Sequence, residues 1–133
     1  MSVADLSSLE LAVVAHAPPG AAVVGASVSP DGSYGVALTF LRSANYLMDD
    51  VFVRNAGGWE GHGGGSGGGI SWTSLGDGEL GVLRYGDEAP DGASIAVVEY
   101  EAQEHRVPVR HGHFLFVAWN SQFSEDPILV GYE

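Results

Sequence analysis

The spacing of apolar residues along this chain changes near residue 20. Before that point, four residues recur at intervals of three and four, which places them on one face of a helix. They are Leu6, Leu9, Val13 and His16. Ser2 or Asp5 stands where a residue that caps a helix start is expected. Pro18 and Pro19 cannot continue helical hydrogen bonding, so the pattern predicts one short N-terminal helix within residues 1–17.

From Ala21 onward apolar and polar residues alternate with a period of two, as in β-strands. The first alternating run spans residues 24–28 and the second spans residues 34–40. Between them lies Ser29-Pro30-Asp31-Gly32-Ser33, a cluster of residues typical of turns. This combination predicts a β-hairpin.

Further short strands are expected along the rest of the chain. They cover residues 51–54, 70–75, 80–85, 94–101, 106–109, 113–119 and 127–132. In the run 94–101, Ala96, Val98 and Tyr100 are predicted to face a core, and Pro108 indicates that its strand lies at an edge. About eight short strands separated by turns favour an all-β fold. We therefore expect a single domain over residues 1–133, with a two-layer antiparallel β-sandwich over residues 21–133 after the helix.

A glycine-rich run interrupts this pattern at residues 57–69. Nine of these thirteen residues are glycine. Ordering one backbone residue costs about 1–2 kcal/mol, and glycine has no side chain whose burial offsets that cost. We predict a flexible loop here. A phosphate-binding loop is excluded because such a loop needs a lysine and the chain has none.

The charge balance is strongly acidic. Five arginines face seventeen carboxylates, the formal net charge is −12, and the chain has no cysteine. Nucleic-acid binding needs clustered basic residues, and anionic lipid repels this charge, so neither nucleic acid nor membrane is expected as a partner. Thiol chemistry is excluded. We expect a cytoplasmic protein without a cofactor, and a protein with a basic surface as the partner; the oligomeric state stays open.

His111 and His113 form the pair that most resembles metal ligands. Two imidazoles separated by one residue can point the same way from a strand, and Glu99 and Glu101 lie close in sequence. A hairpin would bring these carboxylates near the histidines. The four residues are therefore the candidate metal site, although Gly112 between the histidines is expected to form a turn that separates the rings.

The glycine-rich run carries a second candidate site. Trp59, Glu60 and His62 are the side chains of this run suited to contacts with a ligand, and the run could act as a lid over a small-ligand pocket. Trp72 and Trp119 lie in strand-like runs and are expected in the core. No Gly-x-Ser-x-Gly nucleophile elbow is present, and no catalytic residue is predicted.

Three segments resemble small bacterial proteins of no assigned activity. They are Ser29-Pro30-Asp31-Gly32-Ser33-Tyr34, Gly57-Gly58-Trp59-Glu60, and the run from Val107 to Trp119 (VPVRHGHFLFVAW). This resemblance implies an immunoglobulin-like sandwich and carries over no site residue. The leading functional hypothesis is a non-enzymatic β-sandwich binding module. The alternative is a metal-binding or small-ligand-binding protein, or an enzyme, built around His111, His113 and the nearby glutamates.

Overall fold

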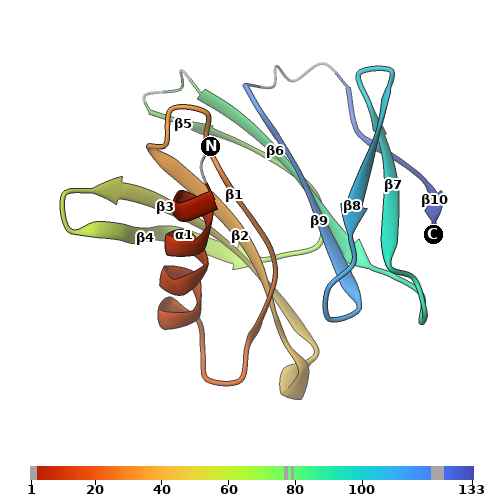
Figure 1. The fold of residues 1–133 in the computed structure, drawn as a ribbon, viewed down its shortest axis with the longest axis horizontal. Helices are drawn as coiled ribbons and strands as arrows, with labels where there is room; N and C mark the ends of the chain where they lie inside the picture. Colours follow the sequence, from red (N-terminus) through yellow and green to blue (C-terminus); the bar gives the residue numbers. More distant parts are fainter. Residues whose placement is uncertain (1–2, 77, 79, 121–124) are drawn as a thin grey trace. The chain divides into compact units, whose positions relative to one another are not determined.

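The computed structural model describes residues 3–76, 78, 80–120 and 125–133, and it is mostly β-strand with one α-helix (Figure 1). The chain forms two compact units, Met1–Gly67 and Gly68–Glu133. The boundary lies inside the glycine-rich run. The prediction of one domain for the whole chain concerns how these units associate, and it stays a prediction.

No helix in the described part of the chain has the length and apolar character needed to cross a membrane.

The first unit is an antiparallel sheet with a helix across one face. Its elements are α1 (Val3–His16), β1 (Ala22–Val28), β2 (Tyr34–Leu41), the short 3-10 helix η1 (Arg42–Ala44), β3 (Tyr46–Asn55) and β4 (Gly58–Ser66). The strands pair in chain order, β1-β2-β3-β4. The predicted helix and the predicted hairpin are therefore confirmed. Ser2 lies outside the described residues, and Asp5 is not a cap because it stands inside α1.

Helix α1 is held against the sheet by apolar packing and by one polar network. Leu9 and Val13 are fully buried in a cluster with Val28, Ala37 and Phe52. A Cβ atom added at Gly35 on β2 would lie 2.7 Å from Leu9 Cδ2, so this glycine gives the helix its close approach. The polar network, described with the site below, joins α1 to β3 and β4.

The turn between β1 and β2 is organised by Asp31. Its carboxylate accepts hydrogen bonds from Ser29 Oγ at 2.7 Å, from the Ser33 backbone N–H at 3.0 Å and from Ser33 Oγ at 3.0 Å. Ser29 Oγ in turn accepts a bond from the Tyr34 backbone N–H at 3.0 Å. Side-chain acceptors thus satisfy the turn backbone, as the Ser-Pro-Asp-Gly-Ser pattern predicts.

These bonds predict a pH dependence of the turn. The hydrogen bond from Ser29, followed by those from Ser33, lowers the pKa of Asp31 below its ordinary value of 3.8. Because the folded pKa is depressed, the contribution of Asp31 to stability is present above pH 3.8 and is lost as the pH falls through the lower folded value. An NMR titration of the Asp31 carboxyl carbon checks this. A midpoint at or above 3.8 would contradict the geometry of the turn.

The glycine-rich run is not a loop, and this prediction is wrong. Residues Gly58–Ser66 form β4, which pairs with β3 from Asn55↔Gly58 to Met48↔Ser66. The cost of ordering glycines is not offset within the run itself. Backbone pairing with β3 and the anchoring of Trp59 on α1 supply the interactions that glycine side chains lack. Tertiary contacts override the local preference of the glycines.

The second unit is a two-layer β-sandwich. One sheet has the order β5-β6-β9, formed by β5 (Gly69–Leu75), β6 (Leu80–Glu88) and β9 (His113–Trp119). The other has the order β10-β7-β8, formed by β10 (Ile128–Tyr132), β7 (Ile95–Tyr100) and β8 (Gln103–Pro108). Both sheets are antiparallel. They share one core that contains Leu83, Ala96, Val98, Tyr100, Val107, Phe114 and Phe116. The predicted core face of β7 and the edge position of Pro108 are confirmed.

Two tight turns place β8 and β9 in the sandwich. Glu101 and Ala102 join β7 to β8 with φ values of 51° and 60°, and His111 and Gly112 precede β9 with φ values of 53° and 75°. Positive φ at both central residues is the signature of type I′ hairpin turns. The second turn leads from the edge strand β8 of one sheet to the edge strand β9 of the other (Figure 1).

Candidate ligand-binding site

The candidate ligand site predicted in the glycine-rich run, Trp59, Glu60 and His62, is divided between the two faces of β4. Trp59 points to α1, where its Nε1–H donates to Ser8 Oγ at 2.9 Å and the Arg54 guanidinium lies 4.6 Å from the centre of its ring. Arg54 also pairs with Asp5 at 2.8 Å. Trp59 thus fixes the helix to the sheet, which is a structural role that the sequence pattern did not reveal.

Glu60 and His62 lie on the opposite face of β4 from Trp59, because side chains alternate along a strand. Glu60 accepts a hydrogen bond from Asn55 Nδ2 at 2.8 Å, and His62 Nε2 lies 3.9 Å from Glu60. Both side chains are largely exposed. The two residues are neighbours of each other, but the structure does not bring them together with Trp59.

The predicted metal ligands are also apart. Glu101 is in the turn before β8, whereas His111 is in the turn after it. Six strand residues at about 3.3 Å each separate the two turns by about 20 Å. Glu99 lies opposite Glu104 of β8 in the strand register, and its side chain is exposed. Within the described part of the chain, no group of three or more His, Cys, Asp and Glu side chains is placed to hold a metal ion.

His111 and His113 have different environments. His111 is an exposed residue of the type I′ turn, whereas His113 is buried at the start of β9. The Nδ1–H of His113 donates to the His111 carbonyl oxygen at 2.8 Å, so this nitrogen is occupied within the turn. This hydrogen bond links the backbone of the turn to a side chain that is buried at the start of β9. The two imidazoles therefore differ in burial and in hydrogen bonding.

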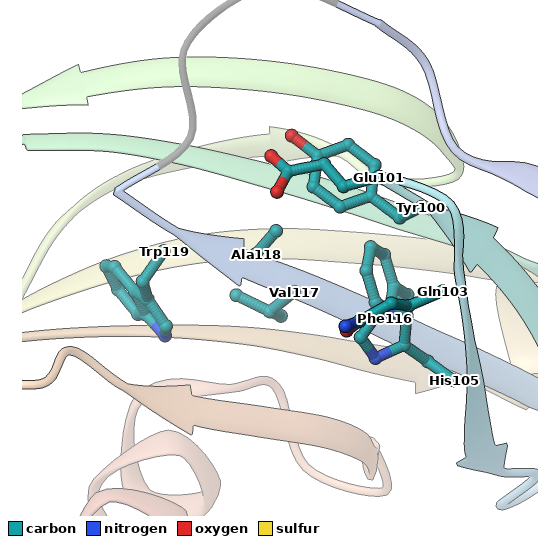
Figure 2. Close-up of a pocket in the computed structure, with 8 residues that line it drawn as sticks. All are labelled: Tyr100, Glu101, Gln103, His105, Phe116, Val117, Ala118 and Trp119. Carbon is teal, nitrogen blue, oxygen red and sulfur yellow. The ribbon is translucent and has the colours of Figure 1, made fainter.

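A cavity of about 290 Å³ lies in the second unit, beside the edge strands β8 and β9. Its described lining residues are Tyr100, Glu101, Gln103, His105, Phe116, Val117, Ala118 and Trp119. Figure 2 shows the end of the β7–β8 hairpin on one side and Trp119 on the other, with β9 between them. The volume is at the lower limit of the range typical of sites for small organic ligands.

Aromatic rings form one side of this cavity. The ring centres of Tyr100 and Phe116 lie 5.7 Å apart with the planes tilted by 59°. His105 continues the series, with its ring centre 5.1 Å from that of Phe116 and a tilt of 52°. Because Phe116 is anchored in the sandwich core, these rings form a fixed surface. Trp119 adds a further aromatic side chain from the end of β9.

The polar groups of the cavity come from the hairpin. Tyr100 is 6% exposed, and its hydroxyl group has no hydrogen-bond partner among the described residues. Glu101, the next residue of the hairpin, also lines the cavity. A buried hydroxyl group without a partner costs about 1–3 kcal/mol.

Sequence reasoning missed this cavity for an identifiable reason. The turn at Glu101 and Ala102 contains neither glycine nor asparagine, so no signal marked the hairpin that brings Tyr100 and His105 together. Trp119 was predicted in the core and instead lines the cavity, half-buried, whereas Trp72 packs against the core cluster as expected. The one available signal was the alternation of Gln103 and His105, which places both side chains on the same side of β8.

Comparison with protein-family models, with curated proteins and with solved structures found no match for this chain.

Proposed function

We propose that this protein is a non-enzymatic binding module whose ligand occupies the cavity between β8 and β9. The observation that carries the proposal is the cavity itself, whose wall combines the aromatic residues Tyr100, Phe116 and Trp119 with a few polar residues. The lining contains a carboxylate, an amide and an imidazole around apolar rings. This mixture of a mainly aromatic wall and a few polar groups is typical of recognition sites.

The alternative built on His111 and His113 receives no support from the geometry. A metal centre or a hydrolytic site needs its ligands or its nucleophile and base within a few ångströms of one another. The structure instead commits His113 to a turn hydrogen bond and separates Glu101 from His111 by the length of β8. We therefore favour binding over catalysis for this chain.

The proposal also includes the location, cofactor and partner expected from the sequence. We propose a cytoplasmic protein that uses no cofactor and whose natural ligand is presented by a partner with a basic surface, in keeping with the net charge of −12. The immunoglobulin-like family that the sequence resembles is also kept as a proposal. A two-layer sandwich in the second unit supports it.

A fragment screen by thermal shift tests the proposed function. A ligand at 100 times its dissociation constant stabilises a folded protein by about 2.7 kcal/mol, which is well within detection. We expect hits among aromatic or amine fragments, and we expect each hit to be weakened at least fivefold by Trp119→Ala. A screen in which no fragment binds, or in which all hits ignore Trp119→Ala, would overturn the assignment of this cavity.

Tyr100→Phe provides a second prediction. Removing the unpartnered hydroxyl group should leave the free energy of unfolding unchanged or raise it by about 1 kcal/mol. Tyr132→Phe is the matched control in the same core, because its hydroxyl group donates to the Glu88 carbonyl at 3.3 Å. That variant should lose about 1 kcal/mol. Urea unfolding of the two variants measures the difference, and equal losses would contradict the role given to Tyr100.

A further inference from the structure

The cavity follows the edge of strand β9 rather than one of its faces. Four consecutive residues of this strand line it, from Phe116 to Trp119 (Figure 2). Neighbouring side chains in a strand point to opposite faces of the sheet, so a surface lined by four residues in a row includes the backbone at the side of the strand. β9 is an outer strand of its sheet, in the order β5-β6-β9. The cavity is therefore bordered by the backbone of an edge strand.

The hydrogen bonds at the start of β9 show which backbone groups face its open edge. The His113 N–H donates to the Arg110 carbonyl oxygen at 3.1 Å, and the Arg110 N–H donates to the His113 carbonyl oxygen at 2.8 Å, so His113 turns its backbone away from β6. The pairing of β9 with β6 has no irregularity along the strand. Backbone groups of successive residues point to alternate sides, so those of Leu115 and Val117 also face the open edge. In the described part of the chain, no strand pairs with β9 on this side.

The two strand edges beside the cavity differ in their protection against pairing. The Val109 N–H donates to the Ser94 carbonyl oxygen, just before β7, at 2.9 Å. By the same alternation, the open edge of β8 carries Glu104, Arg106 and Pro108. Charged residues and proline are among the features that keep edge strands from pairing with other chains. β9 beyond its first residue contains no charged residue, no proline and no bulge, so its edge is open to pairing.

The space beside β9 suits a single extended chain. The β7–β8 hairpin stands on the far side of the cavity and contributes Glu101, Gln103 and His105 to its lining (Figure 2). An added strand extends a sheet by about 4.8 Å, whereas the edge of an intact sheet would bring its neighbouring strands into the hairpin. A second copy of this chain would also bring two net charges of −12 together. These restrictions favour a peptide segment over a whole sheet.

On the basis of the proposed function, we infer that the ligand of this cavity is an extended peptide segment of a partner protein, which adds to β9 as a further strand. Its backbone N–H and C=O groups bond to those of Leu115 and Val117. Every second side chain of the peptide lies level with the aromatic wall of Tyr100 and Phe116, which favours apolar residues at alternate positions. A compact small molecule would meet the rings but would leave the backbone groups of the edge unpaired.

NMR titration of the labelled chain with two peptides tests the inference. The first is acetyl-Thr-Val-Thr-Val-Thr-amide, and the second carries a methyl group on the backbone nitrogen of each of its five residues, so it keeps the side chains and loses their N–H donors. We expect the first peptide to shift the Trp119 indole signal saturably and to bind at least tenfold more tightly than the second. It should also slow hydrogen exchange of the Leu115 and Val117 amides at least tenfold more than that of Phe116, which already faces β6.

Val117→Pro removes one N–H donor from the open edge. Proline is accepted in an edge strand where the N–H faces outward, so no bond to β6 is lost. We expect the first peptide to bind this variant at least tenfold more weakly. Val130→Pro is the matched control, because Val130 is the residue that the register between β10 and β7 skips and β10 does not line the cavity. Its binding should stay within twofold of that of the unchanged chain, and equal losses in the two variants would overturn the inference.

The inference and the proposed function fail in different ways. Equal binding of the two peptides, or binding without slower exchange at Val117, would overturn strand addition and leave a binding cavity. Binding of small fragments without binding of the first peptide would do the same. These measurements use the unchanged chain, so they decide the inference even if Val117→Pro does not fold. A dimer in sedimentation that Val117→Pro dissociates would assign the edge to a second copy and also overturn the inference. The proposed function fails if neither fragments nor peptides occupy the cavity.

Discussion

Phe114→Ala is expected to lower the free energy of unfolding by about 4 kcal/mol. Phe114 is fully buried on β9 and belongs to the core shared by both sheets of the sandwich. Its ring meets Tyr85 edge-on, with centres 5.2 Å apart, and meets Tyr132 of the other sheet at 6.3 Å. Truncation leaves a cavity and removes both aromatic contacts, which add about 0.5–1.5 kcal/mol each beyond burial. Urea unfolding followed by circular dichroism measures the loss.

Two further variants keep this prediction specific. Phe114→Leu retains most of the buried volume and should cost less than half as much as the alanine variant. Val130→Ala removes apolar atoms from a side chain that is 53% exposed on β10, and it should change stability by less than about 0.5 kcal/mol. A loss below about 1.5 kcal/mol for Phe114→Ala would show that the two sheets do not share the core described here.

Phe52→Ala is expected to cost about 3–4 kcal/mol in the first unit. Phe52 is 1% exposed on β3, beneath Leu9 and Val13 of α1, and its ring meets that of His16 edge-on with centres 5.5 Å apart. Losing the ring removes the surface on which the helix rests. The indole N–H signal of Trp59, which donates to Ser8 on α1, reports the loss of helix packing during a urea series.

The control for Phe52 is Leu11→Ala. Leu11 stands on the same helix but is 73% exposed, so its truncation should change stability by less than about 0.5 kcal/mol. If the two variants shifted the Trp59 transition by similar amounts, helix propensity rather than packing against the sheet would hold α1 in place. That outcome would contradict the first core cluster.

Local patterns predicted the elements whose own side chains determine them. The alternation around Ser29–Ser33 predicted the first hairpin because the turn chemistry of Asp31 is local, and the spacing of Leu9 and Val13 predicted the buried face of α1. Strand β9 was predicted with its observed bounds, His113–Trp119, because an apolar run between turn residues is a strong signal.

Other features depend on residues far apart in the sequence. Strand β4 exists because β3 offers a backbone partner and because Ser8 and Arg54 hold Trp59, and none of this is visible in a run of glycines. The separation of Glu101 from His111 follows from the register of β7 and β8, which the residues at the turn do not reveal. The candidate cavity combines Tyr100 with Trp119, which come from different sheets.

The function proposed here rests on a ligand that occupies the space between β8 and β9. Crystals of the chain soaked with a mixture of small amines and neutral aromatic fragments test this claim most directly. We expect fragment density between Tyr100 and Trp119, in contact with the ring of Phe116. Fragments bound elsewhere on the chain, with no fragment between Tyr100 and Trp119, would contradict it.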